Sequence, residues 1–246
     1  LADAEPSIFN DSKNSDSSSG PQLQIKEFPP GHYYTPADGL NSFYSVPDIQ
    51  PAATAAKTGV GPQAFIRQLR RTLEESVEKR LMSDVPLGCF LSGVLDSSII
   101  TAVARRKIGR PIHTFSVGFE GSPDLLAARS LAGTLDTIHH EFVITERAIS
   151  EHLPDIIYHL ESFDQDLVRS AIPTYFTARL AAEHVKVILT GEGADELFAG
   201  YTYYKDIDEI EESLHNELRR SVETLHNINL QRVDRMTMAH SIEGRV

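Results

Sequence analysis

The chain has 246 residues, of which 41% are hydrophobic and 24% are charged, as expected for a globular protein of one large domain or one and a half. Its formal net charge of −12 excludes a protein that coats nucleic-acid phosphates with basic side chains, and no run of about 18 apolar residues that could cross a membrane is present. The one cysteine, Cys89, excludes an internal disulfide framework and a zinc site built from several cysteines.

The first part of the chain is polar and rich in turn-forming residues. Residues 10–20 are low in complexity and predict a flexible loop. Short strands are predicted at residues 24–28 and 31–35, separated by Pro29 and Pro30.

From residue 62 the sequence takes on the pattern of alternating helices and strands. Apolar side chains recur every fourth residue and predict a long amphipathic helix: Phe65, Leu69, Leu73, Val77 and Leu81. Short apolar runs then predict strands at residues 87–91, 112–119, 138–143 and 185–190. Helices are predicted at residues 97–107, 123–135, 148–160 and 173–184, the last with Pro173 near its start. This alternation indicates an α/β fold, a mostly parallel sheet with helices on both faces.

A serine-rich loop follows the first of these strands. Residues 92–98 read Ser-Gly-Val-Leu-Asp-Ser-Ser and lead directly into a helix. The hydroxyls of Ser92, Ser97 and Ser98, with the free amides of the helix start, predict a cradle for phosphate. Asp96 would repel phosphate unless a cation lies between them, which implies Mg²⁺. The alternative is an ordinary helix start capped by serine or aspartate.

An acidic loop follows the last predicted strand. Residues 190–196 read Thr-Gly-Glu-Gly-Ala-Asp-Glu and hold Glu192, Asp195 and Glu196. Carboxylates this close repel one another without a cation or a proton, so the loop favours a cation site. The alternative is a solvated acidic turn that caps a helix. Because ligands bind at the carboxyl edge of such sheets, we expect Asp96 and Asp195 at the same edge.

Two further patterns are weaker. Residues 116–119 end another strand, where Val117 and Gly118 either contact an adenine with their backbone or make a plain strand-to-loop transition. The ten histidines show no spacing typical of metal ligands. His139 and His140 fall on opposite faces of one predicted strand, and structural roles are favoured for them.

The serine-rich loop resembles the pyrophosphate loop of the N-type ATP pyrophosphatases, whose pattern is SGG-x-DS. A set of segments in this order resembles the synthetase half of glutamine-dependent asparagine synthetases: residues 82–88, 92–98, 114–118, 121–124, 139–141 and 190–201. The resemblance runs from about residue 62 to the end and implies a sheet like that of the adenine nucleotide alpha hydrolases. Residues 24–50 are similar to the closing strands of that family's glutaminase domain.

The resemblance implies an organisation in three parts. Residues 1–50 would be the remnant of a glutaminase-type domain, residues 51–61 a linker, and residues 62–246 an ATP-pyrophosphatase synthetase domain truncated at its C-terminus. The chain begins without Met and without a basic and then apolar leader, and it stops without a capping signal. We therefore expect a cytoplasmic fragment of a longer protein.

The implied activity is a ligase that converts aspartate to asparagine through a β-aspartyl-adenylate. It would use ATP and Mg²⁺, with ammonia from glutamine supplied by a domain absent from this sequence. The implied partners are small molecules (aspartate, ammonia or glutamine), with no nucleic acid and no membrane, and a homodimer is left open.

The resemblance also assigns site residues. ATP and its pyrophosphate would contact Leu91, Ser92, Gly93, Asp96, Ser97, Ser98, Val117, Gly118, Thr190 and Gly191. Mg²⁺ would be bridged by Asp96 and Asp195, and Glu192 would be the general base. Arg169 and Glu196 are candidates for contact with the substrate, with surface solvation an equal alternative for Arg169.

Val94 departs from the family pattern, which has glycine there. A β-branched residue disfavours positive φ, so its backbone either stays in a region that valine tolerates or is strained. Two other functions therefore remain open. One is an amide or lactam former that acts on another acid, and the other is a truncated nucleotide-binding module without turnover.

Overall fold

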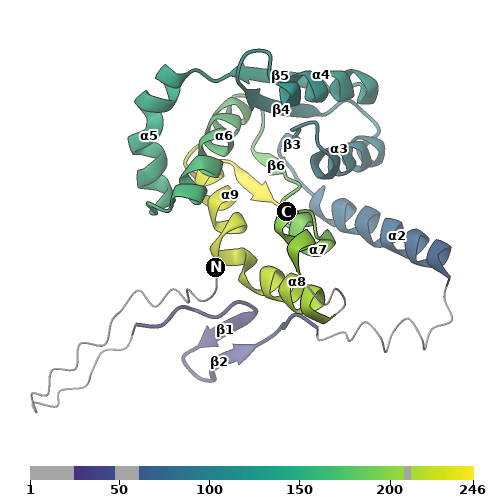
Figure 1. Ribbon diagram of the computed structural model, residues 1–246, viewed down its shortest axis with the longest axis vertical. Helices are drawn as coiled ribbons and strands as arrows, with labels where there is room; N and C mark the ends of the chain where they lie inside the picture. The colour runs from purple at the N-terminus through teal and green to yellow at the C-terminus, as the bar shows by residue number, and fades with distance from the viewer. Residues whose placement is uncertain (1–24, 48–60, 208–211) are drawn as a thin grey trace, which may run out of the picture. The chain divides into compact units, whose positions relative to one another are not determined.

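The computed structural model describes residues 25–47, 61–207 and 212–246 (Figure 1). The chain divides into two compact units, Leu1–Tyr44 and Ser45–Val246. The loop predicted at residues 10–20 lies outside the described residues, as does nearly all of the predicted linker. Within the described ranges, no helix combines the length and the apolar character needed to cross a membrane.

The described part of the first unit is a two-stranded antiparallel hairpin of β1 (His32–Thr35) and β2 (Gly39–Ser42). The strand predicted at residues 31–35 is therefore confirmed. The strand predicted at residues 24–28 is wrong for its described part, because residues 25–29 have no regular structure. Pro29 and Pro30 lack the N–H that a ladder requires, and β1 pairs instead with the segment that follows it.

The second unit is built on a five-stranded sheet with the order β5–β4–β3–β6–β7, in which every neighbouring pair is parallel. Its strands are β3 (Leu87–Phe90), β4 (His113–Gly118), β5 (Ile138–Val143), β6 (Val187–Leu189) and β7 (Glu243–Arg245). The four predicted strands are confirmed, the last in a shortened form. β7 was not predicted, because Glu-Gly-Arg carries no apolar signal.

Helices cover both faces of this sheet, as predicted. One face carries α2 (Pro62–Arg80), α3 (Leu95–Ile108) and α4 (Pro123–Leu135). The other carries α5 (Glu146–Leu160), α6 (Gln165–Ala182) and α9 (Asn229–Met238). Successive side chains of a strand point to opposite faces of the sheet, so neighbouring residues join different cores. Cys89 packs on the first face with Val77 and Val103, whereas Phe90 packs on the second face with Phe115 and Ala178.

Two features of the helices differ from the prediction. α6 starts eight residues before Pro173, because the side chain of Asp164 accepts hydrogen bonds from the amides of Asp166 and Leu167 and caps the helix there. Pro173 therefore lies inside the helix and does not mark its start. The connection between β6 and β7 also forms α7 (Ala194–Phe198) and α8 (Glu212–Thr224), which, like α9, were not predicted.

Candidate functional site

A cavity of about 330 Å³ lies at the carboxyl ends of β3, β4 and β6. Its lining includes nine of the predicted site residues: Leu91, Ser92, Asp96, Ser97, Val117, Thr190, Gly191, Glu192 and Asp195. α6 contributes Pro173, Thr174 and Thr177. The prediction that Asp96 and Asp195 lie at the same edge of the sheet is confirmed.

The serine-rich loop is held in shape by its own side chains. The hydroxyls of Ser92 and Ser97 lie 2.8 Å apart, and the amide of Ser92 donates to the Ser97 hydroxyl at 3.2 Å. Gly93 has φ +82°, and a Cβ there would lie 2.6 Å from the amide nitrogen of Ala128 on α4. Glycine is therefore required at this position both for its backbone conformation and for the close approach of α4.

The first turn of α3 reaches the cavity through Asp96 and Ser97. The side chain before this turn, at Val94, makes no capping hydrogen bond to the first amides. A Cβ at Gly191 would lie 2.9 Å from the amide nitrogen of Ser97, so glycine keeps the space at this helix end free. Because a helix start carries partial positive charge, this arrangement favours an anion.

Val94 itself is not strained. Its φ of −85° and ψ of 170° are extended values that a β-branched residue adopts readily. The first of the two alternatives for Val94 is therefore correct, and its half-exposed side chain lines the cavity instead. The positive φ in this loop falls on the preceding residue, Gly93.

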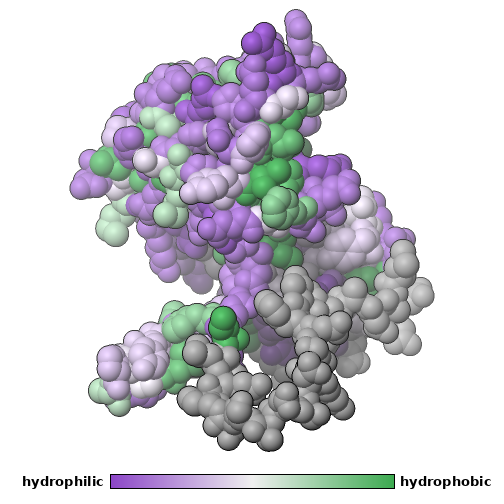
Figure 2. All heavy atoms as spheres, turned by 90° about the vertical axis from the view of Figure 1, so that its left-hand side faces the viewer, coloured by the Kyte–Doolittle hydropathy of each residue, from purple (hydrophilic) through white to green (hydrophobic). Residues whose placement is uncertain are grey.

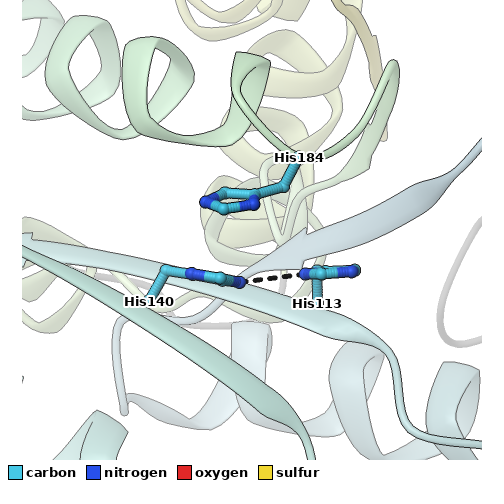
Figure 3. Close-up of side chains that lie close together, drawn as sticks. All are labelled: His113, His140 and His184. Carbon is cyan, nitrogen blue, oxygen red and sulfur yellow. Dashed lines mark hydrogen bonds between the residues drawn. The ribbon is translucent and has the colours of Figure 1, made fainter.

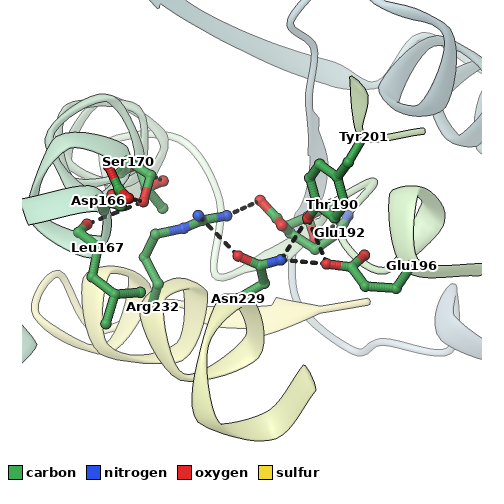
Figure 4. Close-up of polar contacts among 10 residues, drawn as sticks. Asp166, Leu167, Ser170, Thr190, Glu192, Glu196, Tyr201, Asn229 and Arg232 are labelled. Carbon is green, nitrogen blue, oxygen red and sulfur yellow. Dashed lines mark hydrogen bonds and ion pairs between the residues drawn. The ribbon is translucent and has the colours of Figure 1, made fainter. Parts of the chain in front are cut away.

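Glu192 is the carboxylate of the acidic loop that pairs with an arginine. Its Oε1 lies 2.5 Å from a terminal nitrogen of Arg232 on α9 (Figure 4). Burial raises the pKa of Glu192, the Arg232 guanidinium opposes that rise, and the charges of Glu196 and Asp195 add to it. A carboxylate whose pKa is raised holds a proton more readily, which suits a group that accepts one during a reaction.

Asp96 and Asp195 are close enough for their charges to interact. Burial raises the pKa of Asp195, and the neighbouring charges of Asp96 and Glu196 raise it further. A dication between the two carboxylates would remove this repulsion and would find the oxygen ligands that Mg²⁺ prefers. The residues present therefore fit the implied metal, and both line the cavity.

Glu196 is buried beside the cavity and does not line it. It accepts a hydrogen bond of 2.6 Å from the hydroxyl of Tyr201 and another from the amide of Asn229. Arg232 in turn donates to Asn229 at 3.2 Å, so the pair around Glu192 and the pair around Glu196 form one network (Figure 4). Within the described residues, hydrogen bonds from Tyr201 and Asn229 therefore hold the Glu196 carboxylate in place.

The reasoning from sequence missed Arg232, Asn229 and Tyr201. The sequence does mark Arg232 as unusual, because this charged residue lies next to Val233 and one turn from Met236, on the buried side of α9. An arginine on the apolar face of a helix usually has a buried partner. Its position points to an ion pair, but it does not identify Glu192 as the other member.

Four other predicted residues do not line the cavity. Gly93 shapes the loop, as described above, and the Ser98 hydroxyl donates to the carbonyl of Val94. A Cβ at Gly118 would lie 2.6 Å from the Ser122 hydroxyl, so this glycine serves the turn into α4. Arg169 projects from α6 with most of its side chain exposed and pairs with Asp166 at 3.4 Å. The structure therefore does not bring Arg169 to the cavity, and it favours the solvated alternative.

A family model and the similar curated proteins indicate one family. The family model described as asparagine synthase matches residues 68–211 and 206–246. A protein of Schizosaccharomyces pombe named "Probable asparagine synthetase (glutamine-hydrolyzing)" is 38% identical over 242 residues, which cover 91% of this chain and 42% of that protein. Asparagine synthetase (glutamine-hydrolyzing) 1 of Arabidopsis thaliana is 37% identical over 233 residues, covering 90% of this chain and 39% of that protein. The chain spans about two fifths of the length of these relatives.

Among solved structures, NMN synthetase from Francisella tularensis is similar with a TM-score of 0.34 and 16% sequence identity. The match covers 74% of this chain and 93% of that protein. A likeness of this size supports no functional argument.

Proposed function

The chain belongs to the asparagine synthase family, and we propose that it forms the ATP-binding synthetase part of a glutamine-dependent asparagine synthetase. In this proposal it converts aspartate to asparagine through a β-aspartyl-adenylate. The observation that carries the proposal is the convergence of the serine-rich loop and the acidic loop on one cavity, through Ser92, Asp96, Glu192 and Asp195.

ATP would lie across the strand ends. Its phosphates would contact Ser92, Ser97 and the open amides of the first turn of α3, where the partial positive charge of the helix is concentrated. Leu91 and Val117 offer apolar surface to the adenine, and Gly191 allows the backbone to approach the nucleotide. Asp96 and Asp195 would hold Mg²⁺, which when bound offsets the charge of the phosphates.

The chemistry would proceed in two steps. A side-chain oxygen of aspartate attacks the α-phosphorus of ATP, the bond to the β-phosphate breaks, and pyrophosphate leaves. Ammonia then attacks the activated carbonyl carbon, the bond to AMP breaks, and asparagine forms. Activation is required because a free carboxylate is a poor acyl donor, whereas AMP is a good leaving group.

Glu192 would take the proton that the attacking ammonia loses. Its raised pKa and its place in the cavity lining support this role, and Arg232 holds its carboxylate in one orientation. The ammonia would come from glutamine, since the matched relatives are named as glutamine-hydrolysing.

The test is ATP–pyrophosphate exchange by the purified chain, with ATP binding measured in parallel. Exchange that requires aspartate supports the proposal, and Asp195→Asn should abolish it while the control Asp84→Asn, an exposed residue outside the cavity lining, should not. Exchange with another acid in place of aspartate would replace the proposed substrate. ATP binding without exchange for any acid would show that the chain alone is a nucleotide-binding module.

A further inference from the structure

Three histidines converge on the sheet face that α6 covers, and none of them lines the cavity. Nδ1 of His113 and Nε2 of His140 are hydrogen-bonded at 2.9 Å, and the ring of His184 stacks on that of His140 with 3.8 Å between centroids (Figure 3). One nitrogen from each of the three residues lies within 4.8 Å of the others. Such a grouping of imidazoles is a candidate ligand set for a metal ion.

The topology of the sheet explains how residues so distant in sequence meet. His113 begins β4, and the period of two places it on the same face as Phe115. The parallel register sets His140 of β5 directly opposite Phe115, so that His113 and His140 are diagonal neighbours on this face. His184 follows the end of α6 and precedes β6, which brings it to the amino end of the sheet.

Burial and neighbouring charges disfavour a positive charge on two of the three rings, His113 and His140. Burial, together with the neighbouring His184, His113 and His139, lowers the pKa of His140 to about 4, whereas Glu183 opposes this shift. Burial, His184 and Arg110 lower the pKa of His113 in the same way. Neutral imidazole is the form that binds metals.

The distances suit a metal with nitrogen ligands. Two nitrogens bound to one tetrahedral Zn²⁺ at about 2.0–2.1 Å lie about 3.3 Å apart, so His113 and His140 need to separate only slightly from their present contact. The ring of His184 must turn from its stack to direct a nitrogen toward the other two, and its exposed position leaves it room to do so. That exposure also provides a path for the ion from solvent.

We propose that His113, His140 and His184 form a binding site for a transition-metal dication, with Zn²⁺ as the occupant. Three imidazoles and one water would complete a tetrahedral set. Glu183 contributes a favourable charge near the cluster, and Arg110 an unfavourable one. The ion would link β4, β5 and the connection between α6 and β6. The proposal does not depend on the function proposed above.

The test is a calorimetric titration of the untagged 246-residue chain with ZnCl₂ alone. We expect one ion per chain, and a loss of affinity of at least about tenfold in His184→Asn, since even the loss of a residue that only supports a metal ligand costs about 10- to 100-fold. His184 is the variant of choice because an exposed side chain is replaced with little risk to folding. The matched control is His159→Asn, an exposed histidine of α5 outside the cluster, which should bind as the wild type does.

A second measurement tests the ligands directly. Co²⁺ in place of Zn²⁺ should give the intense visible absorption of a tetrahedral site in the wild type and in His159→Asn, and a weaker, shifted spectrum in His184→Asn. Binding should also weaken as the pH falls, because protons compete for the same nitrogens. Absence of binding by the wild type, or equal affinity in wild type and His184→Asn, would overturn the proposal and leave the cluster as a packing feature.

Discussion

The carboxylates around the cavity are chemically similar, yet their surroundings suit them to different roles. Glu192 faces an arginine and is partly buried, whereas Asp195 faces another acid, Asp96. The first arrangement fixes one carboxylate in place, and the second leaves a concentration of negative charge that a cation can relieve. Substitution at each position should therefore affect a different step.

Asp96→Asn and Glu192→Gln test this division of roles. Asp96→Asn removes a metal ligand and should weaken Mg²⁺-dependent ATP binding at least about tenfold, in line with the cost of disturbing a metal site. Glu192→Gln should leave ATP binding nearly unchanged and abolish asparagine formation in the full-length protein, because an amide cannot accept the proton. Calorimetry with ATP and an assay for asparagine provide the two measurements. Equal loss of ATP binding in both variants would contradict the assignment.

Val94→Gly tests the departure from the family's loop pattern. Since Val94 is unstrained, no relief of strain is available. Glycine would instead let the backbone turn its amide toward the phosphates, and one charge-assisted hydrogen bond of about 1.5–3 kcal/mol corresponds to about 10- to 100-fold tighter binding. Titration with a non-hydrolysable ATP analogue and Mg²⁺ gives the affinity. Val85→Gly, at an exposed residue outside the cavity lining, is the control, and equal affinity of Val94→Gly and wild type would show that valine is harmless here.

The helices and strands differ in how clearly the sequence predicts them. α3, α4 and the strands β3 and β4 follow from apolar periodicity, because each buries apolar side chains along one face or stripe. The edge strand β5 was also predicted, although none of its residues is fully buried. α6 was misplaced at its start because Pro173 is a strong helix-start signal, and the cap at Asp164 was overlooked. Only the last part of the apolar stripe of α2 is buried in the described structure, where Val77 is covered while Phe65 and Leu69 remain about half exposed.

The residues of the candidate site also differ in how well the sequence predicts them. Both loops were found because they follow apolar strands and carry clustered glycines, hydroxyls and acids. Arg232 and Asn229 come from a helix whose position depends on tertiary packing, and nothing local to their sequence shows that they approach Glu192 and Glu196. Residues placed by chain topology can be predicted from sequence, whereas partners placed by packing cannot.

Phe115→Ala probes the centre of the sheet. Phe115 has no exposed surface and packs against Ala178 and Ile188, so the loss of its ring should destabilise the protein by about 3–5 kcal/mol. Phe119→Ala, just beyond the same strand, removes a side chain that is 54% exposed and should cost less than about 1 kcal/mol. Urea unfolding at a single pH gives both values. Similar costs for the two variants would contradict the burial described here.

Deletion of residues 243–246 probes the edge strand β7. The amide of Glu243 donates to the Lys186 carbonyl and that of Thr190 to the Arg245 carbonyl, each at 2.9 Å, and the side chain of Arg245 binds the carbonyls of Arg80 and Met82. Loss of these bonds, at about 0.5–1.5 kcal/mol each, should lower the unfolding free energy by at least about 2 kcal/mol.

The same deletion should promote self-association, because it leaves the apolar β6 as an unpaired edge. Light scattering measures the association and urea unfolding the stability. Glu243→Ala is the control, since it removes only the exposed pair with Arg245 and should cost less than about 1 kcal/mol. A deleted chain that stayed monomeric and as stable as the control would show that β7 is dispensable.

At the scale of the molecule, partly buried histidines make stability depend on pH. Burial lowers the pKa of both His140 and His240 to about 4, whereas an unfolded histidine titrates near about 6.5. Below about pH 6.5 the unfolded chain therefore binds protons that the folded protein does not, and this contribution to stability is lost progressively as the pH falls toward 4.

His240→Gln should make the loss of stability between pH 7 and pH 5 smaller than in the wild type. Comparison of the two proteins is needed because Glu192 and Asp195, with raised pKa values, act in the opposite direction. Urea midpoints at pH 8, 7, 6 and 5 give the slopes, and the values at pH 8 set the baseline for the substitution itself. Parallel slopes for the two proteins would show that His240 is not protected from protonation by folding.

The strand order has a consequence for the course of folding. β3, β4 and β5 are consecutive in the chain and can pair as soon as they are made, whereas β6 joins the other side of β3 only after α5 and α6 have formed. Contacts between segments so distant in sequence close slowly, so the half-sheet β3–β5 would form first, with β3 as a temporary edge. The serine-rich loop belongs to this early half and the acidic loop to the late one. The ability to bind a nucleotide would therefore arise last. The rate at which ATP binding recovers during refolding would report when β6 docks onto β3.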